Sequence, residues 1–317
     1  MARTEQGRRQ HAREVAPPLP PIRVLASGKF ADVYHREGAS YVIKSPRDVC
    51  REEAVRQLEH EYNLLRHVIP AHPHLPALIG PTDEVPRGGI AYAHAGVTLE
   101  DAMKSWSDEA TPPLAMSLCM QVLSAVAHMH AHGWAHSDVK SDNVLVRVAP
   151  EAAPCGHVAT LVDMGFAQPA PSWNSRSLDG RRQCTAMYTA PEVLDLDNTE
   201  WHPQRADVWA CGLLFRLALL RGRSADGIGC RTVEELLERR RRYPVRLTDL
   251  AVKRVHLVCG ETSGADAVIN NMLALDSNIR PTAAGALYAL SATMDAHRRQ
   301  RHRSNSGGSD DMTLVDD

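Results

Sequence analysis

The sequence predicts an α+β fold with two lobes, a small β-rich N-terminal lobe and a larger helical C-terminal lobe. Short strand-like segments separated by glycine-containing turns occupy 22–25, 31–36 and 40–44. From Leu99 onward, apolar residues recur mainly at helical spacing. The length of 317 residues is ample for two packed lobes with a sizeable core.

The composition is that of a soluble globular protein. Hydrophobic residues make up 44% and charged residues 23% of the chain, close to the globular average. The net charge of −2 provides no bulk basic field, so we expect no direct nucleic-acid partner. The longest apolar stretch, Val208–Leu220, carries Arg216 and is too short to span a bilayer. We therefore expect no membrane association, and the oligomeric state stays open.

Cysteine usage and the N-terminus bear on the compartment. The seven cysteines are scattered and form no CxxC pair, which favours free thiols in a reducing environment. The first residues lack the apolar core of a secretory signal. We expect an intracellular protein, cytoplasmic and/or nuclear, that is neither secreted nor membrane-spanning.

Composition along the chain divides it into three parts. Residues 1–21 are polar, Arg-rich and end in PPLPP, which predicts a disordered N-terminal arm. Residues 22–297 form one patterned domain, with the N-lobe at about 22–95 and the C-lobe at about 96–297. Residues 298–317 are first basic and then acidic, and we expect a disordered tail.

The elements of the domain follow in order. After the first three strands we expect a helix at 48–68, strands near 75–79 and 89–92, and a small-residue hinge at 93–96. In the C-lobe, the patterns predict a β-hairpin at 144–148 and 157–162, and helices at 114–132, 207–220, 232–242, 266–275 and 283–297.

The turn between the first two strands is a candidate phosphate loop. Gly28 lies in the segment Leu25–Val33, and a glycine there lets backbone N–H groups approach phosphate oxygens. Ala26 and Ala31 occupy positions where such a loop usually has further glycines. By itself this pattern also fits an ordinary hairpin turn.

Lys44, at the end of the third strand, is the second candidate. A strand lysine that faces a cleft is a point charge suited to phosphate, whereas the alternative is a solvated surface lysine. The following helix offers Glu61 as its partner, preferred because Leu64 and Leu65 follow on the inward side. The alternatives on the same helix are Glu52, Glu53 and Glu59.

The segment after the long helix carries the strongest chemical signal. Asp138, Lys140 and Asn143 lie within six residues and lead into an apolar strand. Asp138 can accept a hydroxyl proton, Lys140 can neutralise a transferring phosphoryl group, and Asn143 can offer an oxygen to Mg²⁺. The next strand ends at Asp163, followed by Gly165, which predicts a second metal ligand.

Taken together, these motifs resemble the eukaryotic-type protein kinase family, and the sequence is identified as a divergent member of the Ser/Thr type. The matches run in family order from about 22 to 290 and include the glycine loop, the strand lysine and the helix glutamate. The remaining motifs are His136-Ser137-Asp138…Asn143 for HRD…N, Asp163-Met164-Gly165 for DFG, Ala190-Pro191-Glu192 for APE, Asp207–Gly212 for DVWxxG, and Arg280-Pro281-Thr282.

The resemblance implies a two-lobed protein-kinase-like fold and transfer of the ATP γ-phosphate to Ser or Thr of protein substrates. Mg²⁺, with Mn²⁺ as an alternative, would be the metal cofactor. The implied catalytic residues are Asp138, Lys140 and Thr185, of which Lys140 and Thr185 follow the Ser/Thr-kinase pattern. The implied nucleotide-binding residues are Leu25, Gly28, Val33, Val42, Lys44, Glu61 and Leu145, and the implied metal ligands are Asn143 and Asp163.

The same resemblance assigns two structural roles. Asp207 is expected to support the backbone of the catalytic loop, and Glu192 to form a buried ion pair with Arg280 that fixes the substrate-binding loop. One departure concerns regulation, because Ser137 replaces the arginine that grips an activation-loop phosphate in the family. We therefore expect that alanine at Ser172, Ser175 or Ser177 leaves most activity.

Other functions stay open from the sequence. The altered glycine loop and Ser137 also fit a pseudokinase scaffold. A small-molecule phosphotransferase of the aminoglycoside-kinase type shares the HxDxxxxN segment but lacks the APE, DVWxxG and RPT motifs. The basic run Glu238–Arg242 fits a nuclear-import signal, an acidic-substrate docking site or a solvated helix face. The compact domain and Arg-rich composition resemble kinases of large GC-rich DNA viruses, with a GC-rich bacterium as an equal alternative.

Overall fold

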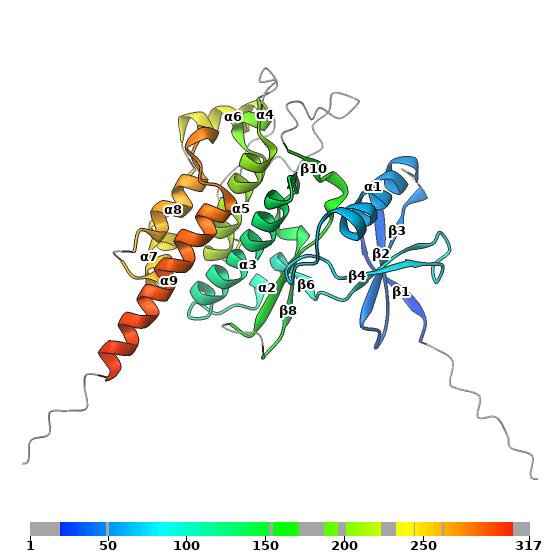
Figure 1. Cartoon of the computed structure of the whole chain (residues 1–317), viewed down its shortest axis with the longest axis horizontal. Coiled ribbons are helices and arrows are strands. Elements are labelled where there is room, and N and C mark those ends of the chain that lie inside the picture. Colours follow the sequence, from blue (N-terminus) through cyan, green and yellow to red (C-terminus); the bar gives the residue numbers. More distant parts are fainter. Residues whose placement is uncertain are drawn as a thin grey trace, which may run out of the picture.

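The computed structural model describes residues 20–48, 51–151, 155–170, 187–195, 201–222, 233–243, 245–261 and 263–306. Within them the chain forms the expected α+β fold with two lobes (Figure 1). The N-lobe is a β-sheet with one helix beside it, and the C-lobe is mainly helical. Residues 1–19 and 307–317, which include most of the two predicted tails, lie outside the described residues.

The N-lobe is built on a five-stranded antiparallel sheet in the order β1-β2-β3-β5-β4. Helix α1 (Arg51–Asn63) buries Ala54, Leu58 and Glu61, and the π-helical turn η2 (Leu64–Val68) continues it. The strands are β1 (Ile22–Ser27), β2 (Ala31–Arg36), β3 (Tyr41–Pro46), β4 (Leu78–Thr82) and β5 (Gly89–Ala93).

The predicted strand at 75–79 was wrong in position, because β4 begins only at Leu78 and continues through Gly80 and Pro81. A Gly-Pro pair suggests a turn, but β4 lies at the edge of the sheet, where a proline removes no ladder hydrogen bond that the sheet requires. The location of the strand in the sheet therefore overrides its local turn signal.

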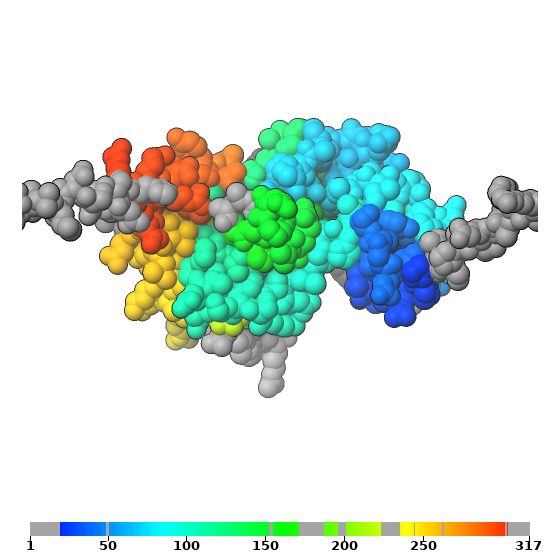
Figure 2. Space-filling view, turned by 90° about the horizontal axis from the view of Figure 1, so that it is seen from below, coloured from blue at the N-terminus to red at the C-terminus, as the bar shows by residue number. Residues whose placement is uncertain are grey.

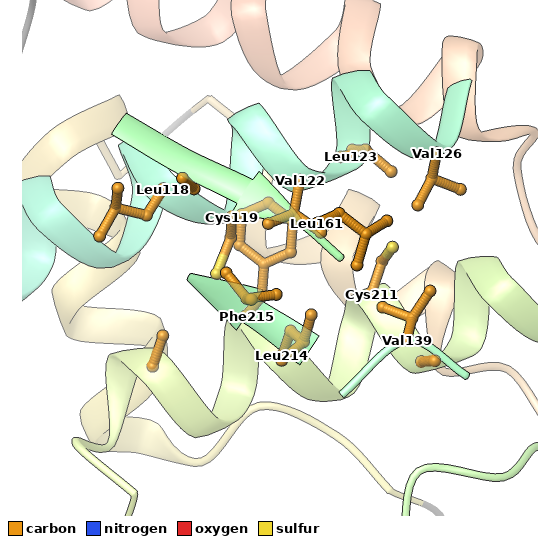
Figure 3. Close-up of a cluster of buried hydrophobic side chains, with 14 of the residues drawn as sticks. Leu118, Cys119, Val122, Leu123, Val126, Val139, Leu161, Cys211, Leu214 and Phe215 are labelled. Atoms are coloured by element: carbon orange, nitrogen blue, oxygen red, sulfur yellow. The ribbon is translucent and has the colours of Figure 1, made fainter. Parts of the chain in front are cut away.

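The C-lobe packs its helices around α3 (Thr111–Ala131). The core combines residues of α3 with residues of α5 and β9, including Leu118, Val122, Leu161 and Phe215 (Figure 3). The other helices are α2 (Leu99–Lys104), α4 (Pro191–Leu194), α5 (Pro203–Leu219), α6 (Val233–Arg242), α7 (Asp249–Cys259), α8 (Ala265–Met272) and α9 (Ala283–Ser306). By length and composition alone α3 could cross a membrane, and its place in the core accounts for that apolar composition.

Two of the longer C-lobe helices differ from the expectation. Helix α7 has no counterpart in the predicted elements, although its core side chains Ala251 and Val255 are fully buried. Helix α9 runs to Ser306 instead of ending at 297. The start of the predicted disordered tail, including the basic cluster 298–303, is therefore helical, because the α9 pattern simply continues through residues that favour helix.

Short elements connect the two lobes at the cleft. The sheet β6-β8-β9 consists of β6 (Val97–Thr98), β8 (Val144–Val148) and β9 (His157–Leu161), so the predicted hairpin is present. Strand β7 (Trp134–Ala135) pairs with β10 (Gln168–Pro169). In the view from below, the blue and cyan N-lobe lies on the right and the yellow and red C-lobe helices on the left, with green and teal segments between them (Figure 2).

The predicted hinge contains one glycine with a strict backbone requirement. Gly96 has φ of +105°, and a Cβ atom there would lie 2.0 Å from the carbonyl oxygen of Val146. Only glycine permits this approach of the hinge to β8. The connection between the lobes is thereby fixed against the strand that carries Leu145.

A group of imidazoles, called here the histidine stack, joins the loop after α1 to α3. The ring centroid of His72 lies 4.8 Å from that of His128 and 5.5 Å from that of His74, and His128 lies 4.5 Å from His132. His74 also lies 2.9 Å, through Nδ1, from the carbonyl oxygen of Ala159 in β9. Burial and the neighbouring His128 lower the pKa of His72 to about 4.

Candidate active site

Lys44 of β3 bridges the N-lobe and the C-lobe. Its ammonium donates to Glu61 Oε2 at 2.6 Å and to Asp163 Oδ1 at 2.8 Å. Glu61 is 3% exposed and Lys44 is 19% exposed at the side chain, so little water competes for the pair. The structure thus pairs Lys44 with the preferred Glu61, while the alternative Glu52 lies in an exposed pair with Arg56.

The local structure explains why Glu61 is chosen. It lies on the buried face of α1 with Ala54 and Leu58, at spacings of seven and three residues that bring side chains onto one side of a helix. Burial alone would lower the pKa of Lys44, but the carboxylates of Glu61 and Asp163 more than offset it and raise the pKa. Lys44 is therefore a fixed positive charge in the cleft.

The catalytic loop gathers three of the predicted residues. Asp138 Oδ2 accepts from Lys140 Nζ at 2.6 Å and from Asn143 Nδ2 at 2.9 Å, and Asn143 also donates to the Asp138 carbonyl oxygen at 2.8 Å. Asp138 is 7% exposed. Burial raises the pKa of its carboxyl, although Lys140 acts in the opposite direction. The loop therefore presents one preoriented carboxylate beside one ammonium.

Asp207 of α5 supports the backbone of the catalytic loop, as expected. Its two carboxylate oxygens accept the backbone N–H groups of His136 at 2.7 Å and Ser137 at 2.8 Å, and His130 Nε2 lies 3.0 Å from Oδ2. The carboxylate is 2% exposed. Ser137 has φ of +67°, a conformation that a non-glycine residue adopts only when its surroundings hold it.

The turn that carries Asp163 is fixed from several sides. Asp163 itself has φ of +67°, and His136 Nε2 lies 3.1 Å from the Val162 carbonyl oxygen just before it. Met164 is fully buried in the place expected for an apolar residue. Lys44 holds the pKa of the Asp163 carboxyl below its usual value although burial acts to raise it. The carboxylate thus stays ionised beside the ammonium.

Besides Lys44 and Glu61, four of the predicted nucleotide residues lie on strands, and Gly28 lies in a turn. Val33 of β2 is opposite Lys44 of β3, and Val42 of β3 is opposite Tyr92 of β5. Gly28 closes the turn between β1 and β2 by donating its N–H to Ala31 O at 2.8 Å. The remaining two are Leu25, which lies exposed on β1, and Leu145, which lies half-buried on β8 opposite Thr98.

Phe30, at the tip of the glycine-loop turn, reaches the segment after Asp163. Its ring meets that of Phe166 edge to face with centroids 6.0 Å apart. Phe166 closes the 3₁₀ turn η4 (Met164–Phe166). The glycine-loop turn of the N-lobe and the turn that follows Asp163 are therefore in contact.

Behind the site, Glu192 and Arg280 form the predicted ion pair. Two guanidinium nitrogens of Arg280 donate to the two carboxylate oxygens of Glu192 at 2.6 and 2.7 Å. The Arg280 side chain is 0% exposed and that of Glu192 is 12% exposed. The pair ties α4 to the turn η5 (Ser277–Ile279) and the residues around it. Thr185, Ser172, Ser175 and Ser177 lie outside the described residues.

Sequence reasoning missed two contacts of the catalytic loop. Gln168 Nε2 donates to Ser137 Oγ at 2.7 Å, and Tyr188 Oη donates to Ser141 Oγ at 2.9 Å in η3 (Ser141–Asn143). Ser141 stands inside the motif and could have been singled out as a buried hydroxyl. Gln168 and Tyr188 offered no local signal, because their partners are 31 and 47 residues away.

The donor set suits a hard divalent cation that arrives with a nucleotide. Asn143 and Asp163 offer amide and carboxylate oxygens, the ligand types that Mg²⁺ prefers. In the described part of the chain, no group of three or more His, Cys, Asp or Glu is arranged to hold a metal ion. This fits Mg²⁺, which is usually held by one or two protein groups together with substrate phosphates.

The comparisons with known proteins agree with this geometry. The chain is 28% identical over 209 residues to CBL-interacting serine/threonine-protein kinase 16 of Arabidopsis thaliana, covering 63% of this chain and 43% of that protein. It is 26% identical over 201 residues to mitogen-activated protein kinase kinase kinase 3 of the same plant, covering 60% and 30%. The chain thus spans less than half the length of these two relatives. The family model described as "Protein kinase domain" matches residues 21–289, and the chain belongs to the protein kinase family.

Proposed function

We propose that this protein is a serine/threonine protein kinase that transfers the γ-phosphate of ATP to Ser or Thr hydroxyls of proteins, with Asp138 as the catalytic base. Family membership implies ATP, a divalent cation and protein substrates in general. The observation that carries the finer proposal is the single constellation in which Lys44 contacts Glu61 and Asp163. In kinases, phosphoryl transfer requires both the pair of the strand lysine with the helix glutamate and the metal-binding aspartate.

In this proposal each charged group has a separate task. Lys44, held by Glu61, is the cation for the α- and β-phosphates. Asp138 orients the substrate hydroxyl and accepts its proton, and a raised pKa brings this base closer to the working pH. Lys140, 2.6 Å from Asp138, offsets the charge that develops on the transferring group.

Asn143 and Asp163 would hold Mg²⁺, with Mn²⁺ as the alternative. The cation neutralises phosphate charge and aligns the phosphate chain. The hydrogen bond from Asn143 Nδ2 to Asp138 fixes the amide, and the bond from Lys44 to Asp163 fixes the carboxylate. Both ligand side chains are therefore oriented before the nucleotide binds.

The choice of Ser and Thr over Tyr rests on Lys140. Its position two residues after Asp138 is the Ser/Thr pattern, and its ammonium lies on the Asp138 carboxylate. Curated relatives are named serine/threonine kinases, which supports the same substrate class. Thr185 is the other residue of this pattern in the sequence and remains a prediction.

A phosphorylation assay tests the proposal. Purified protein is incubated with a mixed Ser, Thr and Tyr peptide array and radiolabelled Mg-ATP, with Lys44→Met and Asp163→Ala as matched inactive controls. We expect labelled Ser and Thr peptides and a loss of at least about 10³-fold in both controls. No signal above the controls would favour the pseudokinase scaffold, and labelled Tyr peptides would contradict the substrate class.

The proposal extends to location and metal. Cys119, Cys155, Cys211 and Cys259 are free, and three of them are buried, which suits a reducing, intracellular compartment that is cytoplasmic and/or nuclear. Replacing Mg²⁺ by Mn²⁺ in the same assay ranks the two cations. Fractionation of the native host cell tests the compartment.

A further inference from the structure

The basic run at the end of α6 is not a uniform solvated face. Arg239, Arg241 and Arg242 are exposed, whereas Arg240 is 2% exposed. Arg240 shares the inward face of the helix with Leu236, four residues earlier, which is 4% exposed. One arginine of the run is therefore part of the interior, and its charge must be compensated there.

Arg240 directs its guanidinium at the backbone of segment 187–189, the described end of the substrate-binding loop, just before helix α4. Nη2 donates to the carbonyl oxygen of Met187 at 2.5 Å and Nη1 donates to that of Thr189. The guanidinium carbon also lies over the Trp209 ring, 5.4 Å from its centroid. A planar fork can serve two carbonyls two residues apart at the same time, which a single ammonium cannot do in the same geometry.

Tyr188, which lies between Met187 and Thr189, is hydrogen-bonded to the catalytic loop. Tyr188 donates its hydroxyl to Ser141 Oγ at 2.9 Å. Tyr188 and Thr189 also line a small hollow, of about 40 Å³, together with Ser137 and Asp138. The stretch that Arg240 holds is thus a wall of the space directly beside the proposed catalytic base.

We propose that Arg240 is a positioning residue for peptide binding, which holds segment 187–189 at the correct distance from Asp138. This inference rests on the proposed kinase function. Because the bonds from Arg240 to Met187 and Thr189 are separate from the bonds that hold Lys44 on Glu61 and Asp163, its removal should weaken peptide use and leave ATP binding intact. The Glu192–Arg280 pair acts on the neighbouring helix α4, and the Arg280 guanidinium shares the Trp209 ring with that of Arg240, 5.0 Å from its centroid.

The test compares Arg240→Met and Arg240→Lys with Arg242→Met, the exposed matched control in the same run. Steady-state rates are measured against a peptide labelled in the array and, separately, against ATP, and ATP hydrolysis is measured without peptide. We expect Arg240→Met to lower kcat/KM for the peptide at least about tenfold, mainly through KM, because two charge-assisted hydrogen bonds are lost. Arg240→Lys should recover part of this loss.

In both Arg240 variants, the KM for ATP and the rate of peptide-free hydrolysis should stay within about twofold of wild type. A tenfold change would mean a loss of about 1.4 kcal/mol at the ATP site, which the bonds of Arg240 do not predict. An Arg240→Met enzyme with wild-type peptide kinetics overturns the inference alone. An equal loss of peptide phosphorylation and of peptide-free hydrolysis would also overturn the inference, because it would indicate general unfolding. Wild-type protein without any phosphotransfer rejects the proposed function and this inference with it.

Discussion

Replacing Glu192 by Gln should destabilise the C-lobe strongly, although the two side chains have nearly the same shape. The change removes one charge and places an amide group against the guanidinium of Arg280, whose side chain is fully buried. Arg280 retains carbonyl acceptors, including Ala274 O at 2.8 Å and Arg205 O at 3.0 Å. These bonds solvate the cation only in part, so it remains buried without a counter-ion in this contact.

The magnitude follows from the geometry. Breaking a buried ion pair by removing one partner costs about 3–5 kcal/mol. The carbonyl bonds and the 12% exposure of Glu192 argue for the lower end, about 3 kcal/mol. With a urea slope of about 3 kcal/mol per molar, the midpoint of unfolding should fall by about 1 M.

The assay is urea unfolding followed by tryptophan fluorescence and by circular dichroism, because coincident curves are needed before a free energy is assigned. Lys104→Met is the matched control. It breaks the pair with Asp101, which has a similar length of 2.7 Å but side chains that are 69% and 58% exposed, and we expect no measurable shift of the midpoint. If Glu192→Gln shifts the midpoint no more than Lys104→Met, the energy assigned to the buried pair is wrong.

Three further changes test other parts of the structure. Asp207→Asn turns an amide N–H toward a backbone donor of the catalytic loop, and kcat should fall at least about tenfold; steady-state kinetics that retain half of kcat would refute this support role. Gly96→Ala forces a Cβ onto the β8 backbone, so thermal melting should occur well below that of Gly38→Ala, whose Cβ would have nothing within 4 Å; equal melting temperatures would contradict the close approach. The folded-state pKa of His72 is lowered from 6.5 to about 4, so its contribution to stability is present above pH 6.5 and is lost as pH falls toward 4. Between pH 7.5 and 5.5 the melting temperature should therefore fall less in His72→Asn than in wild type, and an equal fall would contradict the role given to the histidine stack.

Local chemistry made much of the site predictable. Lys44, Asp138, Asn143 and Asp163 each stand in a short motif whose residue types fit one reaction, and the structure pairs Lys44 with Asp163 and Asn143 with Asp138. Glu61 could be preferred over its neighbours because the apolar spacing of its helix indicates which side is buried. These inferences succeed because each depends on a few residues along one element.

The contacts that escaped prediction depend on residues far apart in the chain. Helix α7 follows a polar stretch, and its burial is decided by the helices around it. Nothing in four consecutive arginines distinguishes Arg240, since only the position of Trp209 and the substrate-binding loop makes it internal. The left-handed backbone of Asp163 likewise depends on its surroundings, because aspartate tolerates this conformation but most aspartates do not adopt it.

The bond from Gln168 to Ser137 bears on how such an enzyme would be controlled in a cell. Where the HRD motif has an arginine, this loop has a neutral hydroxyl that is satisfied by a neutral amide at 2.7 Å. An upstream kinase would find no guanidinium at this position for a phosphate to engage. We therefore expect a phosphate placed beside Ser137 to change the geometry of the catalytic loop little, because Gln168 already satisfies the hydroxyl.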